Sequence, residues 1–201
     1  MDTRYLERIK SQKNPGLDLN STALLVIDIQ RGAFDGLRCS PIAEPDRLVD
    51  HAVSLIGAAR DAGASIVFIQ HCDGPDEVFE EGSAHWALHD RLEPAPGDTM
   101  LKKYASSAFE GTNLAAALEN LNAKELVLCG LQSEFCVYNT AKAALDRGYK
   151  VVIAEDRHGT WPSGGKTASD ISEEVNIALE ASGAALQSTA ALVHALHATR
   201  I

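Results

Sequence analysis

The fold is decided by residues 125–155, which read ELVLCGLQSEFCVYNTAKAALDRGYKVVIAE. This stretch opens with a short apolar run at 125–130 and closes with a second at 149–155, as expected of strands that are covered on both faces. Between the two runs, residues 133–147 have helical spacing, and Gly148 ends the predicted helix. A strand, a helix and a strand in this order predict a right-handed crossover and a parallel sheet.

The same alternation of apolar runs and helical patterns continues on both sides of this unit. The other predicted elements are strands at 22–29, 64–70 and 99–103, helices at 45–62, 112–121 and 172–181, and a short strand and helix within 185–197. We therefore expect one domain over residues 1–201 with an α/β fold. Its three layers are expected to form a Rossmann-like α/β/α arrangement around a six-stranded, mostly parallel sheet.

The composition is typical of a soluble, folded chain and argues against several classes of partner. Of the 201 residues, 45% are hydrophobic and 23% are charged, which is enough apolar material for a sizeable core. The formal net charge of −10 argues against nucleic acid as a partner, because binding to phosphates needs clustered Lys and Arg. Residues 1–16 lack the apolar segment of a signal peptide, and no apolar run is long enough to cross a membrane.

The cysteines show neither a paired CxxC motif nor regular spacing. There are four of them, at Cys39, Cys72, Cys129 and Cys136. A disulfide framework or a structural zinc site is therefore not expected. Free thiols in a cytoplasmic protein are the simplest interpretation.

Three reactive side chains follow or end separate predicted strands. Asp28 lies near the end of the first strand, Lys103 ends the third, and Cys136 comes just after the fourth. Ligands of open parallel sheets bind at the carboxyl ends of the strands, near the point where the strand order reverses. With the strand order 3-2-1-4-5-6, which we assume, the first and fourth strands are neighbours at that point. The three side chains are then expected to meet in one crevice.

Cys136 is the strongest candidate for a nucleophile. It lies in a strand-to-helix turn with Ser133 as the expected N-cap, where the positive end of the helix and the Lys103 ammonium both favour a thiolate. Asp28 is expected to accept the thiol proton, and backbone N–H groups of the turn to hold an oxyanion. Structural roles stay open for each residue: a packed thiol, a turn or cap carboxylate, and a solvated lysine.

Three segments of the chain resemble the isochorismatase-like cysteine hydrolases, in the order in which that family has them. They are LLVIDIQRGAF (24–34), KYASSAFEGTNL (103–114) and GLQSEFCVYNTAKAALDRGYKVVIAEDRHGT (130–160), of which the last is the most specific. The resemblance implies the fold of that family and a hydrolase that acts on a small molecule without a cofactor. It also implies a homo-oligomer, either a dimer or a tetramer.

Carried over residue by residue, the resemblance implies a catalytic triad. Asp28 would be the base, Lys103 the charge stabiliser and Cys136 the nucleophile; the lysine that precedes Lys103 does not have the family's spacing. The resemblance also implies a cis peptide bond between Leu131 and Gln132. This bond would turn the Gln132 N–H toward the oxyanion, beside the N–H of Cys136.

The chain departs from the metal-binding nicotinamidases of the same superfamily. Those enzymes carry an Asp-x-His-x-x-x-His element after the second strand, whereas residues 70–73 here read QHCD. His85 and His89 are four residues apart and would share one face of a helix, but no third ligand is evident. No metal is therefore expected at His71, His85 or His89.

The long stretch between the second and third predicted strands, residues 71–98, is expected to shape the substrate site. Trp86, within this stretch, is expected to belong to a lid over the substrate or to contact another subunit. Gln30 and Phe34, which follow the predicted base, are expected to line the pocket, with packing as the alternative. Glu134 is expected to complement the helix dipole.

The leading hypothesis is a cysteine-dependent hydrolase that cleaves a C–N bond of a small amide, ureide or carbamoyl compound through a thioester. True isochorismatases cleave a vinyl ether without needing a nucleophilic cysteine, so the presence of Cys136 favours a C–N bond. The alternatives are isochorismatase or nicotinamidase activity or, without catalysis, a redox-sensing or ligand-binding protein on the same fold. A protein that serves only as an assembly partner is a further, weaker alternative.

Overall fold

The computed structural model of the chain describes residues 17–198. The expectation that no signal peptide is present concerns residues 1–16 and so falls outside the described part. No helix among the described residues is long and apolar enough to span a membrane. All four cysteines are free thiols, so no disulfide takes part in the fold.

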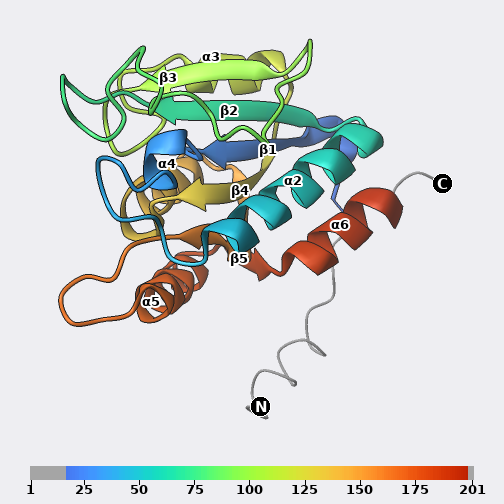
Figure 1. Cartoon of the computed structure of the whole chain (residues 1–201). Coiled ribbons are helices and arrows are strands. Elements are labelled where there is room, and N and C mark those ends of the chain that lie inside the picture. The colour runs from blue at the N-terminus through green and yellow to red at the C-terminus, as the bar shows by residue number, and fades with distance from the viewer. Residues whose placement is uncertain (1–16, 199–201) are drawn as a thin grey trace.

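One six-stranded sheet runs through the molecule, in the order β3-β2-β1-β4-β5-β6 (Figure 1). The strands are β1 (Thr22–Ile27), β2 (Ser65–His71), β3 (Thr99–Lys103), β4 (Glu125–Leu131), β5 (Lys150–Gly159) and β6 (Ala185–Gln187). All neighbouring strands pair in parallel. The assumed strand order is therefore confirmed, and β1 and β4 are neighbours at the point where the order reverses.

Helices cover both faces of the sheet and complete the three layers. The helices are α2 (Pro45–Ala62) and α6 (Thr189–Ala198) on one face, and α3 (Leu114–Asn120), α4 (Tyr138–Asp146) and α5 (Ala168–Ala181) on the other. Alternate residues of β1 point to opposite faces, as a period of two requires. Leu24 and Val26 pack in the core beneath α2 and α6, whereas Leu25 and Ile27 pack in the core beneath the other three helices.

The predicted helix at 133–147 is divided in two. A π-helical turn, Ser133–Val137, precedes the regular helix α4. The expectation that Ser133 is the N-cap is wrong, because Gln132 occupies that position and makes no side-chain cap bond. The Ser133 hydroxyl is fully buried and is hydrogen-bonded to Ser172 and His158 instead.

The segment between β2 and β3 contains no helix and no strand. Its described residues, 72–98, form turns and isolated bridges. The expectation that His85 and His89 share a helix face is therefore wrong. Three prolines and three glycines punctuate the segment, and both residue types interrupt regular structure.

Strands β1 and β4 come very close together where β1 ends. Gly130 of β4 has a φ of +121°, and a Cβ at this position would overlap the carbonyl oxygen of Ile27. The residue after β1 is Asp28, whose φ of +53° turns the chain out of the strand, so β1 ends two residues before the predicted end. Because only a glycine avoids the overlap, Gly130 allows the carboxyl ends of these two strands to lie side by side.

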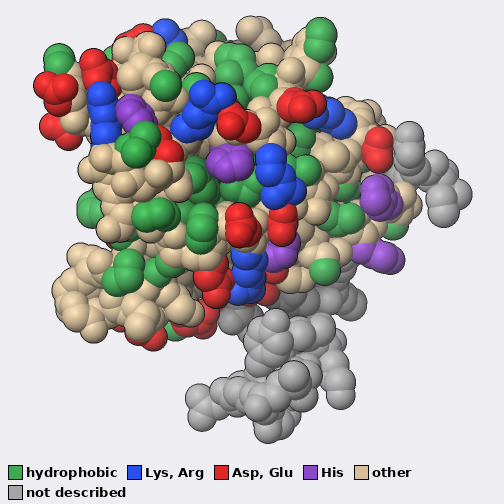
Figure 2. All heavy atoms as spheres, in the orientation of Figure 1, with side chains coloured by type: hydrophobic (Ala, Val, Ile, Leu, Met, Phe, Trp, Pro, Cys, Tyr) green, Lys and Arg blue, Asp and Glu red, His purple; other side chains and the backbone are tan. Residues whose placement is uncertain are grey.

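Acidic and basic side chains are interspersed on the face shown in Figure 2. Ion pairs link α2 to the segment between β2 and β3, including Arg91 with Asp50 and Arg60 with Asp98. These side chains are partly exposed, so each pair contributes about 0–1 kcal/mol. The fold is therefore held mainly by its two apolar cores.

Candidate active site

The three predicted site residues meet at the carboxyl ends of the strands. Lys103 Nζ lies 2.7 Å from Asp28 Oδ2 and 3.0 Å from Cys136 Sγ. Lys103 and Asp28 are buried, with 0% and 2% of their surfaces exposed. Residues from three separate segments thus form one hydrogen-bonded cluster, in which an ammonium lies between a carboxylate and a thiol.

Strand geometry explains why Lys103 and not its neighbour belongs to the cluster. Successive side chains of a strand point to opposite faces, and along β3 the side chain of Lys103 is buried whereas that of Lys102 is exposed. Lys102 Nζ instead lies 2.7 Å from Glu81 Oε1. The family resemblance implied Lys103 and not Lys102, and the structure buries the side chain of Lys103.

Burial and charge act together on the ionisable groups of the cluster. Burial raises the pKa of Asp28, and the opposing effect of Lys103 does not cancel it. Burial alone would lower the pKa of Lys103, but the Asp28 charge and the hydrogen bonds to Asp28 and Cys136 outweigh it and raise that pKa. The ammonium therefore stays protonated.

The Cys136 thiol is protonated at rest. Burial, followed by the Asp28 charge, raises its pKa to about 11, against the lowering effect of Lys103. Lys103 favours the thiolate, as expected, but burial and the Asp28 charge outweigh its effect. A base is needed to remove the proton, and Asp28 has a suitable acceptor: its Oδ1 atom is buried and makes no hydrogen bond.

A cavity of about 340 Å³ opens beside the cluster. Its walls combine both reacting groups with aromatic and apolar side chains from the loops. The lining residues are Asp28, His71, Asp73, Val78, Phe79, Ser106, Leu131, Gln132, Phe135, Cys136 and Trp161. A volume of this size suits a small molecule.

Gln30, Phe34 and Trp86 do not belong to this lining. We expected Gln30 and Phe34 either to line the pocket or to pack, and Trp86 either to belong to a lid or to contact another subunit. Gln30 Nε2 donates to the carbonyl oxygens of His71 and Trp86, so the side chain ties two loop segments together. Phe34 packs edge-on against His89 with ring centroids 4.8 Å apart. Trp86 Nε1 donates to Cys72 at 3.2 Å.

The aromatic walls come instead from Phe79, Phe135 and Trp161, which the sequence analysis missed. Phe135 directly precedes the nucleophile candidate, a position that could have suggested it. Phe79 and Trp161 lie in irregular connections whose path has no periodic signal in the sequence.

The peptide bond between Leu131 and Gln132 is cis. It joins the last residue of β4 to the π-helical turn that carries Cys136. The Gln132 side chain donates to Thr160 Oγ1 at 3.1 Å and to Glu134 Oε1 at 3.2 Å. This network fixes the turn from the side of β5.

One group of potential metal ligands lies at the site. Atoms of Asp28, His71 and Cys136 lie within 4.8 Å of one another. The Lys103 ammonium is within hydrogen-bond distance of all three residues. The positive charge beside these atoms is therefore already supplied by a side chain of the protein. His85 lies elsewhere, with Nδ1 2.6 Å from Asp35 Oδ2.

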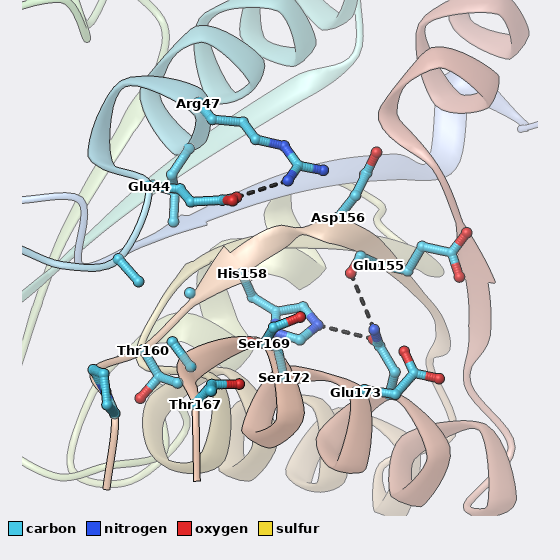
Figure 3. A pocket seen from close by; sticks show the side chains of 16 residues that line it. Glu44, Arg47, Glu155, Asp156, His158, Thr160, Thr167, Ser169, Ser172 and Glu173 are labelled. Atoms are coloured by element: carbon cyan, nitrogen blue, oxygen red, sulfur yellow. Dashed lines mark hydrogen bonds and ion pairs between the residues drawn. The ribbon is translucent and has the colours of Figure 1, made fainter.

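A second, larger cavity of about 450 Å³ lies between the start of α2, the end of β5 and the start of α5 (Figure 3). His158 on its wall is hydrogen-bonded through Nδ1 to Ser133 and through Nε2 to Asn176, each at 2.9 Å. A serine beside a histidine is also the arrangement of a serine hydrolase. Ser133 is 0% exposed, however, so this hydroxyl cannot reach a substrate and the network supports the Cys136 turn.

Comparisons with known proteins show which proteins the chain is similar to. The family model for the isochorismatase domain matches residues 22–189. Streptothricin hydrolase from Streptomyces noursei is 36% identical over 162 residues, which are 81% of this chain but 57% of that protein. Ureidoacrylate amidohydrolase from Methylorubrum extorquens is 27% identical over 180 residues, covering 72% of this chain and 73% of that one.

A solved structure shows the same fold. The cysteine hydrolase from Pseudomonas syringae pv. phaseolicola superposes with a TM-score of 0.84 over 93% of this chain and 99% of that chain. The sequence identity is 19%, so the likeness concerns the fold alone.

Proposed function

The chain belongs to the isochorismatase family, and from that premise we propose that it is a hydrolase of small amides, ureides or carbamoyl compounds. The observation that carries the proposal is the Lys103 ammonium, which is hydrogen-bonded to both the Asp28 carboxylate and the Cys136 thiol beside an open cavity. The relatives add support, because the names of two of them describe hydrolases and one of these is an amidohydrolase.

In the first step, the thiol of Cys136 gives its proton to Asp28 and the sulfur attacks the carbonyl carbon of the substrate. Because the thiol pKa is raised to about 11, the proton leaves only as the attack proceeds, to a base whose own pKa is raised by burial. Lys103 stays protonated and stabilises the developing thiolate. The backbone N–H groups of Gln132 and Cys136 are the proposed donors to the oxyanion.

In the second step, the C–N bond breaks, the leaving nitrogen takes the proton from Asp28, and ammonia or an amine departs. The acyl group remains on Cys136 as a thioester. Water then gives a proton to Asp28 and attacks the thioester carbon. The C–S bond breaks, the sulfur takes the proton back, and the carboxylic acid leaves.

The cavity lining also favours one charge class of substrate. Phe79, Phe135 and Trp161 supply aromatic faces, and two carboxyl side chains, Asp28 and Asp73, also line the cavity. Asp28 is paired with Lys103, whereas Asp73 has no Lys or Arg partner among the described residues. No Lys or Arg belongs to the described lining. We therefore expect uncharged or cationic amides to be better substrates than amides that carry a carboxylate, since aromatic faces and carboxylates both attract cations.

Two further expectations belong to the proposal. A cytoplasmic location is supported by the four free thiols, which persist in reducing compartments. A dimer or tetramer rests on the family resemblance alone, and light scattering of the purified protein measures it directly.

The experiment that tests the function is a panel of amides that includes streptothricin, a ureide, a carbamoyl compound, nicotinamide and isochorismate. Release of ammonia, of an amine or of the product of vinyl-ether hydrolysis is measured for the wild type and Cys136→Ala, with and without a chelator. Hydrolysis of an amide that survives the chelator and disappears in the variant supports the proposal. Hydrolysis that Cys136→Ala retains would show that the nucleophile is assigned wrongly.

Acyl-enzyme formation is a sharper test of the thioester. Mass spectrometry of acid-quenched protein is expected to find the acyl group of the substrate on the peptide that contains Cys136. Cys136→Ser, which keeps the shape of the side chain, serves as the control. The absence of an acylated peptide during active turnover would contradict the thioester step.

A further inference from the structure

We propose that His71, held by Asp73, is a positioning residue that directs the Lys103 ammonium toward the Cys136 thiol. Neither residue belongs to the triad that the family resemblance implies. The inference rests on the proposed role of Cys136, but its test measures the thiol without any substrate. The inference and the proposed function can therefore fail separately.

His71 is the last residue of β2 and is held on every side. Its ring Nδ1 lies 2.9 Å from Lys103 Nζ, and its Nε2 lies 2.9 Å from Asp73 Oδ1. Its backbone N–H donates to Gln30 Oε1 at 2.8 Å, and its carbonyl oxygen accepts from Gln30 Nε2 at 3.0 Å. The other oxygen of Asp73 accepts from the Phe79 N–H at 2.9 Å.

These contacts determine which nitrogen of the His71 ring carries the proton. An ammonium has three N–H donors and no acceptor, so His71 Nδ1 must accept from Lys103 and carry no proton. The proton is then on Nε2, where the Asp73 carboxylate accepts it. Asp73 thus selects the tautomer that offers a lone pair to Lys103.

The His71 lone pair completes the set of acceptors around Lys103. The nearest acceptors of the ammonium are Asp28 Oδ2 at 2.7 Å, His71 Nδ1 at 2.9 Å and Cys136 Sγ at 3.0 Å. The carbonyl oxygen of Ala105 is a fourth, more distant acceptor at 3.4 Å. Three N–H groups face three near acceptors, so the rotation of the ammonium is fixed with one N–H on the sulfur.

Removal of the His71 acceptor releases this rotation. One N–H of Lys103 then turns toward Ala105, and the hydrogen bond to the sulfur weakens. The groups that face the thiol are Asp28, Lys103 and His71, and of these Lys103 is the one that lowers its pKa. We therefore expect the thiol of a variant without the acceptor to ionise at higher pH and to react more slowly.

The test compares His71→Leu with His71→Asn. Asparagine places Oδ1 near the position of the ring Nδ1 and can accept from Lys103, whereas leucine cannot. The readout is the rate of alkylation of Cys136 by iodoacetamide as a function of pH, on the background in which the other three cysteines are replaced by alanine. His71→Leu is expected to slow alkylation about tenfold for each unit by which the thiol pKa rises, and His71→Asn to restore most of the rate.

Asp73→Asn tests the second link. The amide keeps an acceptor for the Phe79 N–H but no longer requires the proton on Nε2 of His71. In the same three-alanine background, this variant is expected to slow alkylation when His71 is present and to have no further effect when His71 is replaced by Asn. Thermal unfolding of every variant separates loss of reactivity from loss of fold.

Three results would each overturn the proposal. In the first, His71→Leu is folded and alkylated at the wild-type rate. In the second, His71→Asn and His71→Leu lose reactivity equally. In the third, Asp73→Asn has the same effect in both backgrounds. Where a substrate has been found, a fall in kcat of about 10- to 100-fold is expected for His71→Leu, and His71→Asn is expected to restore most of it.

Discussion

At the residue scale, two charges act on the Cys136 thiol in opposite directions. After burial, the Asp28 carboxylate is the next largest cause that raises the thiol pKa to about 11, whereas Lys103 lowers it. A thiol that stays protonated until a substrate arrives reacts slowly with oxidants and alkylating agents, because the thiolate is the reactive form. Asp28, the proposed base, therefore suppresses ionisation of the thiol in the resting site and accepts the thiol proton during the attack on a substrate.

Asp28→Asn is expected to change the two properties of Cys136 in opposite senses. Loss of the carboxylate charge lowers the thiol pKa and speeds alkylation by iodoacetamide. Loss of the base slows substrate hydrolysis by about 10²- to 10⁴-fold. Alkylation and hydrolysis are measured on the same preparation, and a variant that loses both activities would contradict the assignment of Asp28.

At the element scale, the close approach of β1 and β4 is the contact on which the site depends. Gly130 faces Ile27 in this pair, and the residues that follow them carry the base and the nucleophile. Because there is no space for a side chain at position 130, residue types other than glycine are disfavoured there.

Gly130→Ala is expected to destabilise the fold strongly. Gly148→Ala is the matched control, because Gly148 also has a positive φ, of +85°, but a Cβ there meets nothing within 4 Å. The control is expected to cost about 1–2 kcal/mol from its backbone conformation, and Gly130→Ala clearly more. Urea unfolding measures both, and equal losses would show that the overlap with Ile27 is relieved without cost.

The hydrogen-bonded link from β5 to the Cys136 turn predicts a dependence of stability on pH. Burial lowers the pKa of His158 below its ordinary value of 6.5, with Asn176 and Asp156 acting in the opposite direction. Below about pH 6.5 the unfolded chain therefore binds a proton that the folded chain does not. The stabilisation of the fold by neutral His158 is complete above the pKa of this histidine in the unfolded chain. It is lost as the pH falls through the lower pKa that the histidine has in the folded chain.

His158→Gln is expected to reduce this dependence. Between neutral pH and about pH 5, the wild-type free energy of unfolding should fall more steeply than that of the variant, by up to about 1.4 kcal/mol per pH unit. His194→Gln, at an exposed position of α6, is the control. Equal slopes in the wild type and His158→Gln would contradict the buried, neutral state of His158.

The regular elements were largely predictable, and the irregular ones were not. Helix α2 has the predicted bounds because apolar spacing, Pro45 and Gly63 define it locally, and strand β3 also has its predicted bounds. The start of α5 lies four residues before the predicted one, since the capping box of Thr167 and Asp170 opens the helix ahead of its apolar face. The π-helical turn has no local signal because it is held by contacts with distant residues.

The same contrast applies to the site. Asp28, Lys103 and Cys136 could be placed because each ends or follows a strand and the strand order brings those ends together. The cavity walls at Phe79 and Trp161 could not, since irregular loops reach the cavity by paths that depend on tertiary contacts. The role inferred for His71 depends on the distances from its ring nitrogens to Lys103 and Asp73, which the sequence does not give.

At the scale of the whole molecule, the net charge of −10 adds to the local charge of the cavity. A field of this sign attracts cationic molecules and repels anionic ones over distances comparable with the Debye length, about 10 Å at 0.1 M salt. The proposed substrate preference therefore has a long-range part as well as a contact part.

Added salt is expected to separate these two parts. For a cationic amide, kcat/KM should fall as the salt concentration rises, because screening slows the encounter. For an uncharged amide of the same shape it should stay nearly constant. The measurement is a salt series with both substrates, and an equal response of the two would show that the net charge has no part in substrate selection.

The reacting groups and the cavity walls come from different kinds of structure. Asp28, Lys103 and Cys136 are placed by the ends of sheet strands, whereas Val78, Phe79 and Trp161 lie on the connections. The connections can therefore diverge while the strand ends stay the same, so new substrate ranges are accessible to evolution without loss of the reaction itself. A library for directed evolution that varies the wall residues alone is the corresponding route in the laboratory.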